Sequence, residues 1–256
     1  MTSTAWIVLW YGTISALATG LGAIPFIFIK KVGKRTTGFF SAMAAGLMAG
    51  ASFGLLQEAA DMNKLKMIIG FLAGIVFIGM INLSVHYFKK KKLQVEDEGE
   101  IFQRLSRQFG NNMTTTLLLI IIMTAHSAAE GIGIGTSFGG TVRFGVLMSI
   151  AIAIHNIPEG LAISAVMVKN GNSWLKAALW SIFTSIPQPL LAVPAYLFVA
   201  TFKPYVPVGL AFAGGAMIWL VFSEIAPEAA EEIGGEKAAT ITTLSIAVML
   251  LIQYFL

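Results

Sequence analysis

The sequence predicts an all-α, polytopic membrane protein with eight transmembrane helices. Of the 256 residues, 56% are hydrophobic and only 12% are charged, whereas soluble domains carry about 25% charged residues. The mean hydropathy is +0.79. Eight apolar segments are each long enough to cross the hydrocarbon core of a bilayer, which takes about 20 helical residues. The charged residues gather mainly between these segments, as expected for helices that lie in lipid.

The eight segments form a single transmembrane domain over residues 1–256. They cover residues 5–29, 37–60, 66–88, 113–136, 142–168, 174–201, 207–229 and 239–256. The first segment has no basic leader before it and is longer than the apolar part of a signal peptide. We therefore interpret it as a transmembrane helix rather than a cleaved signal peptide.

The distribution of basic residues predicts the orientation. The connections after segments 1, 3, 5 and 7 hold 13 of the 17 Lys and Arg residues. Cytoplasmic loops carry the excess of Lys and Arg, so these connections are expected in the cytoplasm and both termini outside it. The net charge of +4 is explained by these loops and does not indicate a nucleic-acid partner.

The longest connection, residues 89–112, is expected to be a cytoplasmic loop. It opens with four lysines, continues through an acidic stretch, and ends in an amphipathic run at 101–109. Blocks of charge in a loop are usually solvated, and the later run could form a short helix on the membrane surface. The chain has no Cys, so a disulfide and a thiolate metal site are both excluded.

Segments 4 and 5 carry the same motif, His-x-x-x-Glu-Gly. The first copy runs from His126 through Glu130, and the second from His155 through Glu159. Residues four apart lie on one face of a helix, so each copy points an imidazole and a carboxylate in the same direction. Two of the three histidines in the chain belong to these motifs.

These four side chains lie at bilayer depth, where an acidic residue costs about 3 kcal/mol on insertion scales. A divalent cation would satisfy all four at once, because imidazole nitrogen and carboxylate oxygen are the ligands of zinc and similar metals. The alternative is two separate His–Glu hydrogen bonds that hold helices together. We favour metal binding, because ionisable groups inside a membrane are usually functional.

Pro158 stands between His155 and Glu159. A proline inside a helix removes one hydrogen bond and clashes with the carbonyl four residues back, here that of Ile154. In lipid the freed carbonyl needs another partner. The proline is therefore expected to expose backbone toward a wet cavity beside the site, although an ordinary helix kink would leave the same pattern.

Several neutral or soft groups could form a second metal position or orient the main ligands. They are Ser127, Asn156, Gln188 and Met48. For Gln188, which stands between two prolines, a hydrogen bond between helices is an equally good interpretation. Three acidic residues near segment ends, Glu58, Glu224 and Glu228, could line the path of an ion into and out of the site, or simply be charges at the membrane interface.

Segments 2 and 7 end alike, in Glu58-Ala-Ala-Asp61 and Glu228-Ala-Ala-Glu231. By the topology above, segment 2 ends outside and segment 7 ends inside. Similar sequences in opposite orientation are typical of an inverted-topology repeat. The sequence thus predicts a 3+2+3 arrangement with segments 4 and 5 at the centre.

Together these features resemble the ZIP (Zrt/Irt-like) metal-transporter family, in particular its short bacterial-type branch. The most specific part is His155-Asn-Ile-Pro-Glu-Gly160, and the similarity covers the whole chain. The resemblance implies zinc uptake through a mid-membrane centre, often binuclear. Its ligands by this resemblance are His126, Glu130, His155 and Glu159.

The chain departs from the family pattern at three positions. It has Ser127 where many members have Asn, Gln188 where many have an acidic residue, and neutral Asn156 where an Asp or Glu often stands. Each difference lowers the negative charge or ligand strength at the second metal position. We therefore expect one well-formed metal site and a weak or absent second one.

The predicted function is a transporter that moves divalent metal, most of all zinc, into the cytoplasm by alternating access. The transported ion is Zn²⁺, with Fe²⁺, Mn²⁺ and Cd²⁺ as further candidates, and no prosthetic group is expected. The expected partners are the metal ion and the lipid bilayer of the cell membrane, without nucleic acid and with a homodimer as a possible assembly. The alternatives are an intramembrane metal-dependent hydrolase and a metal sensor without flux. The hydrolase is disfavoured because, with each Glu used as a ligand, no carboxylate remains as general base.

Overall fold

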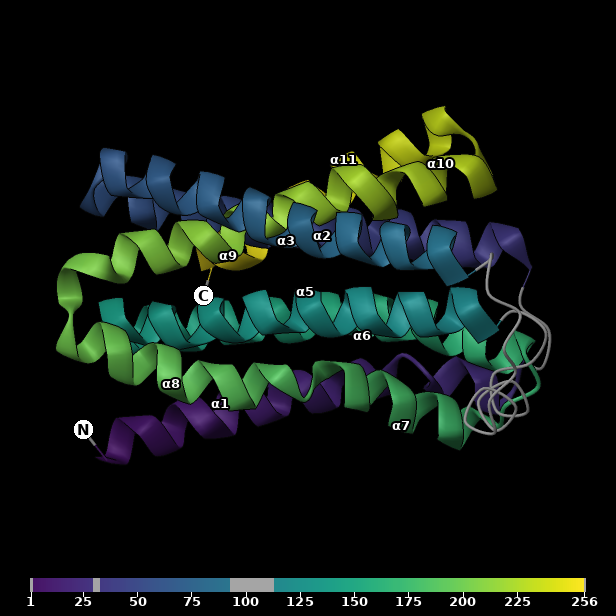
Figure 1. Cartoon of the computed structure of the whole chain (residues 1–256), viewed down its shortest axis with the longest axis horizontal. Coiled ribbons are helices and arrows are strands. Elements are labelled where there is room, and N and C mark those ends of the chain that lie inside the picture. Colours follow the sequence, from purple (N-terminus) through teal and green to yellow (C-terminus); the bar gives the residue numbers. More distant parts are fainter. Residues whose placement is uncertain (1, 30–32, 93–112, 256) are drawn as a thin grey trace.

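The computed structural model describes residues 2–29, 33–92 and 113–255, and all regular elements within these ranges are helical (Figure 1). In chain order they are α1 (Thr2–Leu21), η1 (Ile24–Ile27), α2 (Lys34–Met62), α3 (Lys64–Lys92), α5 (Met113–Gly140), α6 (Val142–Lys169), α7 (Trp174–Ser185), α8 (Pro187–Thr201), η3 (Lys203–Tyr205), α9 (Val206–Leu220), η4 (Val221–Ile225), α10 (Ala226–Ile233) and α11 (Gly235–Phe255).

The prediction of eight membrane helices is confirmed. Seven stretches of the described residues are long and apolar enough to cross a membrane, and α5, with 28 residues, is the eighth helix of that length. The sixth crossing is made of α7 and α8, which meet at Ile186, and the seventh is made of α9, the π-helical η4 and α10. Part of the connection expected at 89–112 is helical, because α3 continues to Lys92. Residues 93–112, including the amphipathic run at 101–109, lie outside the described residues.

Short polar residues and glycine set where several helices begin and end. The side chain of Thr141 accepts a hydrogen bond from the backbone N–H of Phe144 (3.1 Å) and starts α6. Only Thr141 separates α5 from α6, and the two helices pack on each other in antiparallel orientation. Gly234 has a φ of +87°, which residues with a Cβ rarely adopt, and it forms the turn between α10 and α11.

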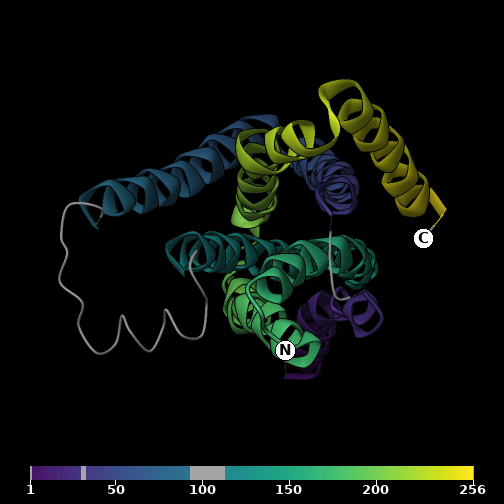
Figure 2. The same ribbon diagram turned by 90° about the vertical axis from the view of Figure 1, so that its right-hand side faces the viewer.

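The helices form two layers (Figure 2). One layer holds α2, α3, α9, α10 and α11, and the other holds α1, α5, α6, α7 and α8. The layers meet where α2 packs on α6 and α5 packs on α9. Small buried residues line this seam: Ala45 and Ala49 on α2 and Ala151 on α6 belong to one apolar cluster, and Gly133 of α5 faces the methyl group of Ala213 on α9. Small side chains allow membrane helices to approach closely.

The packing of the helices follows the expected 3+2+3 arrangement. The α3 helix packs on α9, and α11 packs on α2 in the related place. The contact of α5 with α8 corresponds to that of α6 with α1. The contact of α5 with α9 corresponds to that of α6 with α2. Exchanging the first three crossings with the last three, and α5 with α6, therefore reproduces the same set of neighbours. The two central helices carry the repeated motif.

Candidate metal centre

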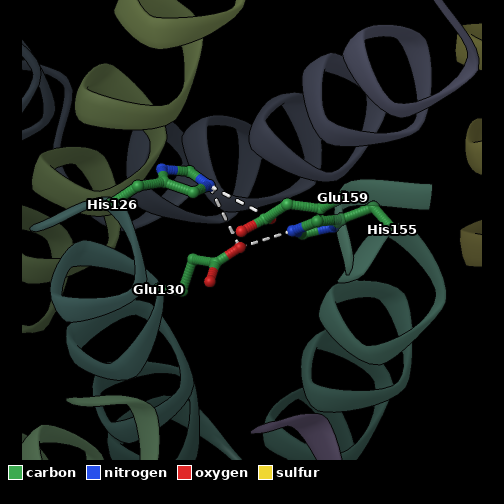
Figure 3. Close-up of side chains that lie close together, drawn as sticks. All are labelled: His126, Glu130, His155 and Glu159. Atoms are coloured by element: carbon green, nitrogen blue, oxygen red, sulfur yellow. Dashed lines mark hydrogen bonds and ion pairs between the residues drawn. The ribbon is translucent and has the colours of Figure 1, made fainter. Parts of the chain in front are cut away.

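The two motifs come together in the middle of α5 and α6. His126 and Glu130 extend from α5, and His155 and Glu159 extend from α6, so that all four side chains point toward one another (Figure 3). Each side chain can offer one ligand atom such that these atoms all lie within 4.8 Å of one another. None of the four is more than 4% exposed.

Glu130 is at the centre of the cluster. Its Oε1 atom lies 2.6 Å from Nε2 of His155 and 3.2 Å from Nε2 of His126. The same His126 nitrogen lies 3.9 Å from Oε2 of Glu159. One carboxylate oxygen thus contacts imidazoles from both helices, and this places the two motifs in a common site.

Several buried polar atoms of the cluster have no hydrogen-bond partner among the residues that the structure describes. Both carboxylate oxygens of Glu159, both ring nitrogens of His126, and Nδ1 of His155 are in this state. A buried polar group without a partner costs about 1–3 kcal/mol, and more when it is charged. A cation between the four side chains would compensate this cost for Nε2 of His126 and Oε2 of Glu159, which face each other inside the cluster.

The donor set fits a borderline divalent metal. Two imidazoles and two carboxylates supply four ligands of the types that bind zinc, and the carboxylates balance the charge of the ion. Four ligands at about 2.1 Å around a tetrahedral ion lie about 3.4 Å apart. Binding would therefore lengthen the contact between His155 and Glu130 and shorten the contact between His126 and Glu159. Small side-chain rotations are enough for both changes.

Gln188 and Asn156 form a hydrogen-bonded chain beside the four side chains. The amide of Gln188 donates to Oε2 of Glu130 (2.6 Å), and the amide of Asn156 donates to Oε1 of Gln188 (3.2 Å). Asn156 also donates to the backbone carbonyl and the hydroxyl of Ser15 on α1, at 3.0 and 3.2 Å. These contacts fix the orientation of Glu130 from behind and leave its Oε1 atom facing the imidazoles.

The other two neutral candidates are placed differently. The hydroxyl of Ser127 is buried and has no hydrogen-bond partner within the described ranges. Met48 is 1% exposed and packs in the apolar cluster that α2 forms with α6 and α9. Within the described part of the chain, its sulfur makes no hydrogen bond to the four clustered side chains.

The three acidic residues proposed for the ion path lie outside the cluster. Glu58 is half-buried near the end of α2, and Glu228 is exposed on α10. Glu224 lies in the π-helical segment η4, where its Oε1 atom accepts a hydrogen bond from Asn82 of α3 (2.7 Å). Their role in a path stays a prediction.

The sequence reasoning missed the contribution of α1. Ser15 contacts Asn156, and Thr19, four residues later on the same face, shares a hydrogen bond of 2.7 Å with Ser185 of α7. All of these groups are buried. The spacing of Ser15 and Thr19 is the only signal in the sequence. Serines and threonines are common in membrane helices, so spacing alone could not identify a partner.

The glycine that ends each motif has a packing role. A Cβ added to Gly131 would lie 2.7 Å from the backbone oxygen of Gln188, and one added to Gly160 would overlap the backbone carbonyl of Thr19. Each motif thus uses one face of its helix for the cluster and another for close contact with a neighbouring backbone. The α6 helix continues without interruption through the buried Pro158.

Comparison with known proteins gives a consistent picture. A family model described as ZIP Zinc transporter matches residues 92–253. A putative zinc transporter of Arabidopsis thaliana is 42% identical over 237 residues, which are 91% of this chain and 36% of that protein. The chain therefore spans about a third of this longer relative.

Two bacterial proteins are similar over most of their length. The zinc transporter GufA of Myxococcus xanthus is 28% identical over 240 residues, 89% of each chain. The zinc transporter ZIPB of Bordetella bronchiseptica is 28% identical over 241 residues, which are 90% of this chain and 74% of that protein.

Proposed function

This chain belongs to the ZIP zinc transporter family, and we propose that it is a multi-pass membrane transporter that moves divalent metal ions, zinc above all, into the cytoplasm. The observation that carries the proposal is the buried cluster of two imidazoles and two carboxylates, with ligand atoms within 4.8 Å of one another. Ionisable groups at this depth mark an ion pathway.

The donor set supports zinc as the principal ion. Imidazole nitrogen disfavours magnesium and calcium, which prefer oxygen ligands. Cadmium, iron(II) and manganese(II) remain the competitors to test. His126, Glu130, His155 and Glu159 would hold the ion as transported substrate, so no resident cofactor is required.

We propose that the centre holds one metal ion at a time. A second ion beside the first would need anionic ligands, and the groups at that place are the neutral amides of Asn156 and Gln188. The amide nitrogens of both residues and Oε1 of Gln188 are already hydrogen-bonded. Of the two amide oxygens, that leaves only the neutral Oδ1 of Asn156 without a partner among the described residues. The expected stoichiometry is one zinc ion per chain.

The proposed mechanism is alternating access around this centre. Its support is the packing of the helices, which repeats when the first three crossings are exchanged with the last three. A site on the axis of such a repeat can be opened to either side by equivalent movements. The excess of Lys and Arg in alternate loops supports an orientation in the cell membrane with both termini outside the cytoplasm. The proposed assembly is a homodimer.

Members of this family are transporters and not enzymes, which removes the hydrolase alternative. A sensor would bind the metal without moving it, and a channel would conduct without saturation. Both differ from a transporter in flux, so flux is the property to measure.

The test is zinc influx into proteoliposomes that contain a zinc indicator. The wild type should show saturable influx, and Glu130→Ala and Glu159→Ala should abolish it. Glu231→Ala, which changes an exposed acidic residue of α10, is the matched control and should transport normally. Tight zinc binding without influx in the wild type would refute transport, and influx proportional to zinc at all concentrations would indicate a channel.

A further inference from the structure

A cavity of about 720 Å³ lies at the end of the bundle where α10 turns into α11 and α2 begins. It is separate from the metal centre, and none of its lining residues belongs to the two motifs. Its walls come from the first turns of α2 and α11, and from the last turn of α10. Helices α2 and α11 begin here and α10 ends here, and each belongs to a candidate membrane span, which places the cavity at the level of the lipid headgroups.

The lining changes from charged to apolar along the membrane normal. On α2, Arg35 precedes Phe39 by four residues, and on α11, Lys237 precedes Ile241 by the same spacing. Four residues advance a helix by about 6 Å. Both walls therefore carry a cation at the outer level and a large apolar side chain one turn deeper. This order matches the polarity of a phospholipid, whose headgroup lies above its acyl chains.

The outer level carries charges of both signs. Glu232 and Glu236 stand beside the two cations in the lining. One oxygen of Glu232 accepts a hydrogen bond from the hydroxyl of Thr37 (2.6 Å). Within the described ranges, the charged groups of Arg35, Glu236 and Lys237 make no hydrogen bond or ion pair. Two cations and one carboxylate are thus free to bind a ligand that carries both a negative and a positive group.

We propose that this cavity binds a phospholipid with a primary-amine, zwitterionic headgroup, of the phosphatidylethanolamine type. Arg35 and Lys237 bind the phosphate, since charge-assisted hydrogen bonds to phosphate are the strongest these side chains form. Glu236 accepts hydrogen bonds from the ammonium group. The glycerol backbone and the start of an acyl chain lie against Phe39 and Ile241. The inference does not depend on the transport function.

The same lining disfavours other headgroups. A choline headgroup has no N–H to donate to Glu236, so it loses the hydrogen bonds and keeps only the weaker charge attraction. An anionic glycerol headgroup satisfies the two cations but leaves the carboxylate of Glu236 without a positive partner. The charge pattern therefore predicts a preference for phosphatidylethanolamine over phosphatidylcholine and phosphatidylglycerol.

The experiment is native mass spectrometry of the purified, delipidated full chain titrated with each of these three lipids. The double variant Arg35→Gln/Lys237→Gln should bind phosphatidylethanolamine about tenfold more weakly or worse, as expected when charge-assisted hydrogen bonds are lost. The control variant Lys64→Gln/Lys203→Gln makes the same charge change at exposed positions at the opposite end of the bundle. It should bind like the wild type.

Further measurements guard against a folding defect. Circular dichroism should give the same helix content for both double variants, and Arg35→Lys/Lys237→Arg should restore lipid binding. Equal affinity for the three lipids, or equal loss of binding in both double variants, would overturn the proposal. So would competition by soluble glycerophosphoethanolamine at the same concentration as the lipid, because it would show that the acyl chains add nothing.

Discussion

Replacing Glu159 by glutamine should stabilise the metal-free protein and weaken metal binding at the same time. The side chain is 4% exposed, and in the described part of the chain neither of its oxygens has a hydrogen-bond partner. Glutamine keeps the shape and removes the charge. An ordinary structural carboxylate would behave differently, since its loss would destabilise the protein.

The magnitude follows from the burial of the carboxylate. A buried polar group without a partner costs about 1–3 kcal/mol, and a charged one costs more. The neutral amide of glutamine is cheaper to bury, so the metal-free variant should gain about 1 kcal/mol or more. For a chain of this size, that gain raises the melting temperature by about 2–4 °C.

The loss of metal affinity should be larger. Changing a group that only supports a ligand typically weakens binding by about 10–100-fold. Glu159 is proposed to contact the ion and to balance half of its charge, so the loss should be about 100-fold or more. This corresponds to about 2.7 kcal/mol.

Two assays test the two directions. Thermal unfolding in the presence of a chelator measures the stability of the metal-free protein, and zinc titration against a competing chelator measures affinity. Glu231→Gln, on the exposed face of α10, should change neither. A variant at position 159 that unfolds earlier and binds zinc as tightly as the wild type would refute the reasoning.

Three further predictions concern the surroundings of the centre. Gly160→Ala should destabilise the protein by about 1–3 kcal/mol, because its Cβ would overlap the carbonyl of Thr19. Gly235→Ala should unfold like the wild type, because no described atom lies within 4 Å of the added Cβ; equal unfolding of the two variants would contradict the packing argument. Gln188→Leu should lower zinc affinity by about 10–100-fold with unchanged helix content, because Glu130 loses its donor, and unaltered affinity in a chelator competition would show that this hydrogen bond has no role. Zinc affinity should fall as the pH is lowered from about 7.5 to about 5.5, because protons compete with the metal for imidazole and carboxylate; calorimetry at both values measures this, and a constant affinity would exclude imidazole ligands.

The sequence was sufficient to predict the helices and the composition of the cluster. Apolar length predicts a membrane helix directly, and the four-residue spacing in each motif predicts that His126 and Glu130 share a face. The relation between the two motifs was also accessible, because a short connection joins the segments predicted at 113–136 and 142–168, and consecutive segments of a chain usually lie next to each other. The proposed role of these residues as metal ligands stays a prediction.

Contacts between distant helices could not be predicted from periodicity. The hydrogen bond from Asn82 to Glu224 and the contact of Ser15 with Asn156 join residues 142 and 141 positions apart. A serine or an asparagine in an apolar helix shows that some partner exists, since a bare polar group is costly in lipid. The choice of partner depends on how the layers pack. Likewise, no pattern in the sequence predicts the π-helical turn of η4.

The glycine that closes each motif has a consequence for how related sequences diverge. The proposed metal binding requires His126 and His155, whereas close contact with the backbone of a neighbouring helix requires Gly131 and Gly160. A descendant that lost the ion would be free to replace the histidines and glutamates, but it would still need both glycines in order to fold. A chain that keeps both glycines but has lost the histidines would therefore be recognisable as a former transporter of this type. A search for the whole motif would not find it.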